Sequence, residues 1–405
     1  MRNILLLIML ALTAVSEANI KCPASQQCDC IPKLKEYQSE VTCHREKNPN
    51  AHILLVHIEA NNAIIFQCNP NMLWIDFDLL DGLSVGPVNS VMFSFCPVPN
   101  KSFLKFFQSF NISEITRFTY HHTNISNTLE RSQFTGFVNL TLLSLDSCGI
   151  TGLPADLFLD LPTLTTLDLR DNNVELPAHI FDHLSKLQVL ELGHNNISHL
   201  EKGIFQNLTS LRVLNLWSNR LQNLSREIFS GLSNVEYLEL SYNYLTSLPA
   251  DVFAEMPKMK EISLHGNMFK SLPQGLFSFI PLLKKVKLND NKEIIQQLPS
   301  GFLANPTNLE EVHLSLCGIT SLPEDVFWGS NGITNLSFQQ NALTSLPEKL
   351  FKDSTKLLYL DLSYNNLAEL PESVFSSLNN LKVLNLGYNE LTIITRLVIH
   401  CIYYT

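Results

Sequence analysis

Apolar and polar residues alternate along most of the chain in a pattern that returns at a nearly fixed interval. The stretch LSYNYLTSLPADVF, from Leu240 to Phe253, recurs as LSYNNLAELPESVF from Leu362 to Phe375. Aligned on L-x-x-L-x-L-x-x-N, neighbouring units lie 24 residues apart, except for one interval of 23 and one of 26. Self-similarity at this period is typical of a leucine-rich-repeat solenoid. Eleven units begin at Leu140, Leu164, Leu187, Leu211, Val235, Met259, Leu283, Leu309, Ile333, Leu357 and Leu381.

Each unit is predicted to contain one short strand. The fourth and sixth positions are apolar and the residues between them are mostly polar, as where Leu238 and Leu240 flank Glu239. This alternation points the leucines inward and the glutamate outward. Strands of successive units should therefore stack into a parallel sheet along one side of the coil. Weaker copies of the pattern begin at Ile115 and near Val88.

The ninth position of most units is asparagine, which we expect to be buried. A buried amide there can satisfy backbone groups in neighbouring turns, and its loss should cost about 1–3 kcal/mol per unit. Cys148 and Cys317 occupy the same slot and are interpreted as buried thiols, not as nucleophiles or disulfide partners. The asparagines are Asn172, Asn195, Asn219, Asn243, Asn267, Asn291, Asn341, Asn365 and Asn389.

A phenylalanine follows the Leu-Pro turn of most units. We expect the rings to form one interior column, in which each contributes about 1.5–3 kcal/mol. The aromatic stripe is therefore predicted to be core and not a cofactor site. Leu303 takes the slot in the 26-residue unit, and the other members are Phe158, Phe181, Phe205, Phe229, Phe253, Phe277, Phe327, Phe351 and Phe375.

The predicted fold class is an α/β-type leucine-rich-repeat solenoid. A curved parallel β-sheet forms its concave face, irregular and short helical segments form its convex face, and a disulfide-stapled cap covers the N-terminal end. The predicted domains are a signal peptide at 1–18, a cysteine-rich N-terminal cap region at 19–87, degenerate repeats at 88–139, eleven repeats at 140–394 and an atypical uncapped tail at 395–405.

The first residues, MRNILLLIMLALTAVSEA, read as a secretory signal. Arg2 is basic, the run from Ile4 to Val15 is almost wholly apolar, and small residues precede Asn19. The alternative is a membrane anchor, but the run is short for a span of about 20 residues. No later segment is predicted to cross a bilayer, so we expect a soluble, extracellular mature chain.

Eight Asn-x-Ser/Thr sequons agree with export and predict a glycosylated surface. Asn335 falls at the third position of its unit, so a glycan there is expected to project into the concavity and discourage docking on its C-terminal half. The sequons begin at Asn100, Asn111, Asn124, Asn139, Asn196, Asn207, Asn223 and Asn335.

The cysteines are concentrated near the N-terminus, where they predict a disulfide-stapled cap in a secreted chain. A zinc site is the alternative, Cys68 and Cys96 could form a further bridge, and the spacing leaves the connectivity open. At the other end the tail TRLVIHCIYYT breaks the repeat and leaves Cys401 odd, so this end is expected to fray or associate. The cap cysteines are Cys22, Cys28, Cys30 and Cys43.

Composition and motifs argue against catalysis. The net charge of −10 disfavours nucleic acid or anionic lipid as the main partner. The chain has no H-E-x-x-H, G-x-S-x-G, phosphate loop or G-x-G-x-x-G. His121 and His122 are interpreted as solvent-facing, with a metal role as the alternative. We therefore predict no enzyme activity, no metal and no cofactor.

The surface that the register singles out is the outward side of the strands in the second to fifth units. An exposed tryptophan and two tyrosines beside valines and carboxylates resemble a binding hot spot, although repeat surfaces commonly carry some aromatic residues. The candidate ligand-binding residues are Thr166, Asp168, Arg170, Val189, Glu191, Val213, Asn215, Trp217, Tyr237, Glu239 and Tyr242. The lysines of the next two units are interpreted as a solvated face: Lys258, Lys260, Lys284, Lys285 and Lys287.

Beyond the generic repeat, several strings resemble the N-terminal ectodomain of insect Toll receptors. They are CDCIPKLKEYQSEVTC and NPNAHILLVHIEANNAIIFQCN in the cap region, and LRVLNLWSNRLQNL and MFKSLPQGLF in the repeats. The resemblance spans Cys22 to Leu391. It implies a receptor for a secreted cystine-knot cytokine of the Spätzle type, used in innate immunity and embryonic patterning, with contacts at the cap and early repeats. It also implies receptor dimerisation.

The same resemblance implies how the cap cysteines pair. The bridges would be Cys22 to Cys30 and Cys28 to Cys43, with Cys68 to Cys96 beside them. Family members continue into more repeats, a membrane helix and a cytoplasmic Toll/interleukin-1 receptor domain, none of which this chain contains. The chain is therefore interpreted as a soluble decoy, an incomplete gene model or a fragment of the receptor. The alternative function is a secreted repeat protein of an immune complex or matrix with another protein partner.

Overall fold

The structure is a computed structural model that describes residues 28–35, 38–45, 48–58, 62–69, 77–80, 82–85, 88–125, 129–291, 297–304 and 306–392. The chain forms two compact units, residues 1–166 and 167–405, which are described separately. The predicted signal peptide, Cys22 and the tail with Cys401 lie outside the described residues. Within the described part, no helix has the length and apolar character that crossing a bilayer requires.

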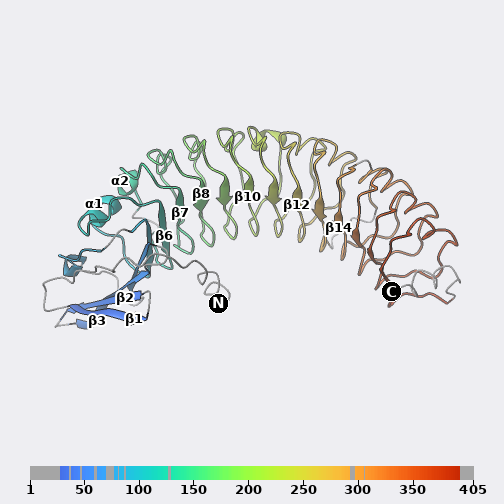
Figure 1. Cartoon of the computed structure of the whole chain (residues 1–405). Helices are drawn as coiled ribbons and strands as arrows, with labels where there is room; N and C mark the ends of the chain where they lie inside the picture. Colours follow the sequence, from blue (N-terminus) through green and yellow to red (C-terminus); the bar gives the residue numbers. More distant parts are fainter. Residues whose placement is uncertain are drawn as a thin grey trace. The chain divides into compact units, whose positions relative to one another are not determined.

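The first unit begins with antiparallel strands and then changes to parallel coils (Figure 1). Strands β1 (Cys28–Lys35), β2 (Gln38–Arg45), β3 (Asn48–Ile58) and β4 (Ala63–Cys68) pair antiparallel in this order. From β4 onward the pairing is parallel, through β5 (Ser90–Ser94) and β6 (Arg117–His121) to β7 (Leu142–Ser144). Strands β5 and β6 follow Val88 and Ile115, where the sequence predicted degenerate repeats, and β4 adds a repeat-like strand that the sequence pattern did not reveal.

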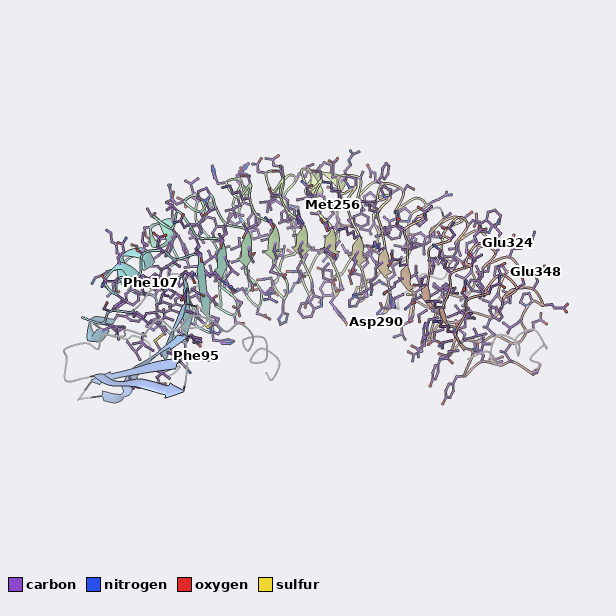
Figure 2. All side chains as sticks on the ribbon, viewed as in Figure 1. Phe95, Phe107, Met256, Asp290, Glu324 and Glu348 are labelled. Atoms are coloured by element: carbon purple, nitrogen blue, oxygen red, sulfur yellow. A yellow bond between two sulfur atoms is a disulfide. The ribbon has the colours of Figure 1, made fainter. Side chains whose placement is uncertain are left out.

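Short helical segments connect these strands and help to fill an aromatic core. They are η2 (Phe77–Leu80), α1 (Phe103–Gln108) and α2 (Arg131–Phe134). The ring of Phe93 stacks on Phe66 at 4.7 Å and on Tyr120 at 5.2 Å, and the fully buried Phe107 of α1 packs against it at 5.8 Å. Figure 2 shows Phe107 inside the first unit, between helix and strands. Offset aromatic packing of this kind stabilises the core beyond the free energy gained by burying the ring surface.

The disulfide expected between Cys68 and Cys96 is present, with an S–S distance of 2.03 Å. It joins the end of β4 to the segment after β5, where the two parallel strands leave the sheet. In the cap, the backbone register of β1 and β2 sets Cys28 opposite Cys43. The side chains of Cys28, Cys30 and Cys43 lie outside the described part, so the two cap bridges stay predictions.

The second unit is a regular parallel sheet with one strand per coil. Its strands line the inner side of the unit's curve, and the turn-rich segments, with the short helix η3 (Arg226–Phe229), line the outer side (Figure 1). From Val189 to Asn385, each strand pairs in parallel with the equivalent residues of its neighbour, as where Leu214 faces Leu238. Strand β8 (Thr166–Asp168) begins at the last residue of the first unit. The others are β9 (Val189–Glu191), β10 (Val213–Asn215), β11 (Tyr237–Glu239), β12 (Glu261–Ser263), β13 (Lys285–Lys287), β14 (Glu311–His313), β15 (Asn335–Ser337), β16 (Tyr359–Asp361) and β17 (Val383–Asn385).

The asparagine ladder is present, with six of its asparagines buried as predicted and Asn172, Asn341 and Asn389 only half-buried. The side-chain amide of Asn243 donates to the carbonyls of Leu216 at 3.0 Å and Leu240 at 3.1 Å, and its oxygen accepts from the backbone N–H of Leu221 at 3.0 Å. Cys317 is a buried free thiol whose Sγ donates to the Leu288 carbonyl at 3.1 Å. Burial raises the pKa of both ladder thiols, Cys148 and Cys317, to about 12. Both are therefore structural donors and poor nucleophiles.

The phenylalanine column is also confirmed. The rings of Phe351 and Phe375 stack at 6.1 Å, and those of Phe181 and Phe205 at the same distance. Leu303 fills its slot completely buried, and the neighbouring Phe302 contacts Phe277 at 5.3 Å. All column members are at most 6% exposed, so the stripe is core.

The residue before each ladder position has a positive φ that the pattern did not predict. Tyr242, Asp290 and Gln340, for example, have φ values of 52°, 60° and 56°. Left-handed backbone costs a non-glycine residue about 1–2 kcal/mol. The amide of Asn243 bonds the carbonyls of Leu240 and Ser241, which precede Tyr242, and so holds the strained turn closed.

Candidate ligand-binding surface

The outward residues of β9 to β13 enclose a hollow of about 240 Å³ on the strand side of the second unit. It is lined by the outward residues of these strands and by Leu214, Leu238 and Ile262, which lie between them along the strands. The lining residues are Glu191, Val213, Leu214, Asn215, Tyr237, Leu238, Glu239, Glu261, Ile262, Ser263, Lys285 and Lys287.

Carboxylates and lysines divide the rim of this hollow. The carboxylate of Glu191 accepts from the Asn215 amide at 2.7 Å, and that of Glu239 accepts from the Ser241 backbone N–H at 2.9 Å. At the other end Lys285 pairs with Glu311 and is the main cause of the lowered pKa of that carboxyl. The rim therefore changes from acidic to basic along the coil axis, beside the apolar Val213.

An aromatic ridge runs along the turns that follow the strands. We define it as His194, Trp217, Tyr242 and His265, whose rings contact in sequence at 5.6, 6.3 and 4.9 Å. Trp217 is 38% exposed and Tyr242 is 48% exposed. The turn after β13 is equivalent to these turns and carries Asp290. Figure 2 shows Asp290 on the strand side of the second unit, opposite Glu324 and Glu348.

The ridge is positioned by its neighbours on both sides. A Cβ on Gly266 would lie 2.7 Å from the Tyr242 ring, so only glycine lets this ring lie against the next turn. His265 shares a hydrogen bond of 2.8 Å with the Ser263 hydroxyl, and burial lowers its pKa. At the other end, the imidazole of His194 contacts the Asp171 carboxylate. The aromatic rings are thus held in place before any partner arrives.

The predicted binding residues separate into groups. Val189, Glu191, Val213, Asn215, Tyr237 and Glu239 lie together on β9 to β11, as the register implied. Trp217 and Tyr242 lie beyond their strands, on the ridge, and Arg170 lies beyond β8. Asp168 is only 8% exposed because it is ion-paired with Arg170 at 2.7 Å. Thr166 is half-buried at the end of the first unit.

Other residues of this surface were missed as site residues. Glu261, Ser263, Lys285 and Lys287 continue the same outward positions into β12 and β13, so extending the register by two units would have found them. His194 and His265 belong to the ridge because the chain turns sharply after each strand, which the alternating pattern does not encode. Tyr244 and Met268 are exposed two residues further along their turns, at 45% and 40%.

His121 departs from its interpretation as a solvent-facing residue. It is the half-buried last residue of β6, and its Nε2 has no hydrogen-bond partner in the described part of the chain. Burial lowers its pKa, which favours the neutral ring. His122, by contrast, is exposed and follows the strand. The described residues contain no group of three or more metal-binding side chains.

The sequons differ in their surroundings. Asn335 is half-buried within β15, whereas the other seven asparagines are exposed and lie outside the strands. Whether these asparagines carry glycans stays a prediction.

Comparisons with known proteins identify the repeat family and a related protein. Leucine rich repeat family models match residues 160–176, 174–217, 209–269, 307–367, 331–391 and 357–401. Protein toll of Drosophila melanogaster is 34% identical over 172 residues, which are 42% of this chain and 15% of that protein.

Solved structures agree with this relationship. Toll in a Drosophila Toll–Spätzle complex superposes with a TM-score of 0.79 at 32% identity, over 90% of this chain and 48% of the Toll chain. The chain therefore spans about half the length of that receptor chain. A TLR13–ssRNA13 complex matches with a TM-score of 0.65 at 23% identity, which shows the fold alone. Together the repeats, the ladder and the family matches show that the chain belongs to the leucine-rich-repeat proteins, and its sequence and fold are similar to those of Toll.

Proposed function

We propose that this chain is the extracellular ligand-binding region of a Toll-type receptor and recognises a Spätzle-type cystine-knot cytokine. The observation that carries the proposal is the preorganised aromatic ridge beside the hollow of β9 to β13, on a fold that matches Toll from a Toll–Spätzle complex. Tryptophan and tyrosine held in fixed positions are the side chains most enriched at protein-binding hot spots.

The dimensions of the surface support a contact that includes the ridge. Three-residue strands spaced about 4.8 Å apart give β9 to β13 a face of roughly 10 Å by 24 Å. A standard protein interface covers about 800 Å² on each partner. The strand face alone is too small, so a protein ligand must also cover the turns that carry Trp217, Tyr242 and Tyr244.

The charges of the surface favour a complementary ligand over a purely apolar one. Glu191 and Glu239 lie on either side of Asn215, in the row next to Val213 and Tyr237. Lys285 and Lys287 follow one strand beyond Glu261. A ligand that presents an apolar strip with basic residues beside it, and an acidic group further along, would match this order. Such complementarity fixes register and accelerates association more than it adds affinity.

Alanine substitution tests the site. Trp217→Ala and Tyr237→Ala should each weaken binding of a purified Spätzle-type cytokine by at least about 1 kcal/mol, roughly fivefold in Kd. Surface plasmon resonance with the secreted chain measures this, and Tyr364→Ala in the turn after β16 is the matched control, because Tyr364 is 43% exposed and Tyr237 is 41% exposed.

Two outcomes would contradict the proposal at different levels. Unchanged affinity in both variants would remove the site but leave the function. Failure of the unmodified chain to bind any Spätzle-type cytokine, together with capture of a different secreted protein, would favour the alternative of a repeat protein with another partner.

A further inference from the structure

The sequon at Asn335 is unlike the other seven because its three residues are the strand β15. Asn335 and Ser337 point outward and Leu336 points inward, with only 1% of its surface exposed. The acceptor amide and the hydroxyl of the sequon therefore share the face that binds ligands in the proposed function.

The Asn335 amide is chemically available. Its side chain makes no hydrogen bond within the described residues, whereas the ladder residue Asn341 of the same coil donates to the carbonyls of Leu314 and Phe338, each at 2.8 Å. The backbone N–H of Asn335 is bonded to Glu310, so the strand is fixed while the side-chain nitrogen is not engaged.

An exposed aromatic ring lies next to this amide. In the register of β15 and β16, Asn335 is paired with Tyr359, whose side chain also points outward. The Tyr359 hydroxyl donates to Asp361 at 3.1 Å, which fixes one end of the ring and leaves 37% of the residue exposed. A tyrosine ring anchored at its hydroxyl offers an apolar face to a neighbour one strand away.

We propose that Asn335 carries an N-glycan whose first sugar packs on the Tyr359 ring. The apolar face of a pyranose ring complements an aromatic face, and neighbouring strands lie about 4.8 Å apart, within reach of a sugar attached to the adjacent side chain. The exposed tyrosine is thus covered by a group of the same chain and is not a second protein-binding site.

The consequence for docking rests on the proposed function. A glycan is bulky and hydrated, and on β15 it would overlie Glu311 on one side and Tyr359 on the other. No sequon falls on β9 to β14. The glycan therefore ends the open strand face at β14 and confines a protein ligand to the strands before it.

Two variants separate the glycan from the side chains around it. Ser337→Ala destroys the sequon but also removes the hydrogen bond of 2.8 Å between the Ser337 and Ser315 hydroxyls. Ser315→Ala removes the same hydrogen bond and keeps the sequon, so it is the matched control. Glycopeptide mass spectrometry of the chain secreted from insect cells should find a glycan at Asn335 in the unmodified chain and in Ser315→Ala, and none in Ser337→Ala.

Hydroxyl-radical footprinting then tests the packing without any ligand. Labelling of Tyr359 should rise at least twofold in Ser337→Ala and stay unchanged in Ser315→Ala, while labelling of Tyr237 is the same in all three. An unmodified Asn335 in the secreted chain would overturn the modification. Equal labelling of Tyr359 with and without the glycan would overturn its contact with the ring. Neither result tests whether the chain binds a cytokine.

Discussion

At the scale of single residues, the ladder asparagine determines how each strand ends. Asn243 is 3% exposed and its amide bonds the carbonyls that precede the left-handed Tyr242. The sequence pattern predicted the buried amide because asparagine recurs at one position. It did not predict the strained neighbour, because many residue types occupy that position and the strain is imposed by the hydrogen bonds around it.

Replacing one ladder residue should measure how much its amide contributes to the free energy of unfolding. Asn243→Ala leaves buried carbonyl and N–H groups without a partner, and we expect it to lower the free energy of unfolding by about 1–3 kcal/mol. Asn243→Cys should cost less, because Cys317 shows that a thiol can donate to the carbonyl of the preceding coil. Urea unfolding followed by circular dichroism gives the comparison.

The control for this prediction is Gln222→Ala, which changes an exposed residue of a neighbouring turn and should stay within about 0.5 kcal/mol. If Asn243→Ala proved no more destabilising than Gln222→Ala, the ladder would not be a source of stability.

At the scale of elements, charged side chains connect adjacent strands of the second unit. Lys260 pairs with Glu236 at 2.6 Å and Lys284 with Glu310 at 2.8 Å, each across one strand spacing. Exposed pairs of this kind contribute at most about 1 kcal/mol each. Lys260 and Lys284 therefore behave as the solvated face that was predicted, with much of their charge neutralised by an adjacent coil. Lys285 and Lys287 of the same cluster instead line the hollow.

Two half-buried histidines in this region should make stability depend on pH. Burial lowers the pKa of His265 and of His313 below the unfolded value near 6.5. The unfolded chain then binds more protons, so stability is full above about pH 6.5 and falls as the pH decreases from there toward the folded pKa values. The groups that face them are Tyr242, Ser263, Glu239, Lys287 and Asp290 for His265, and Glu311, Lys285 and Lys287 for His313.

Thermal unfolding between pH 7 and 5 tests this expectation. The melting temperature should drop over this window, and the drop should be smaller in His265→Gln and in His313→Gln than in the unmodified chain. His183→Gln, at an exposed position, should leave the drop unchanged. The lowered pKa of Glu311 acts in a separate window, below about pH 4.5, and does not interfere.

The elements also show how far the sequence determines the fold. Strands β7 to β17 lie where the repeat places them, because each is specified by its own local alternation of apolar and polar residues. Strands β1 to β3 were not predicted, since an antiparallel pairing such as that of β2 with β3 depends on contacts between segments without a repeat. The outward side chains of β9 to β11 followed from the register, whereas His194 and His265 required the conformation of the turns.

At the scale of the whole molecule, two strands of identical sequence allow a matched test of where along the coil a protein ligand binds. Both β10 and β17 read Val-Leu-Asn. Val213→Asn with Asn215→Ser, or Val383→Asn with Asn385→Ser, turns either strand into an Asn-Leu-Ser sequon on its outward face. The same bulky group is thereby added at two places by the same chemistry, with occupancy verified by mass spectrometry.

A ligand confined to the strands before β15 should respond to only one of these additions. The glycan on β10 lies in the hollow beside the ridge and should lower affinity for a Spätzle-type cytokine by more than a hundredfold, because it occupies the centre of the contact where hot spots concentrate. The glycan on β17 should change affinity by less than threefold. The reverse order would place the ligand at the far end of the second unit, and the hollow and the ridge would then need another role.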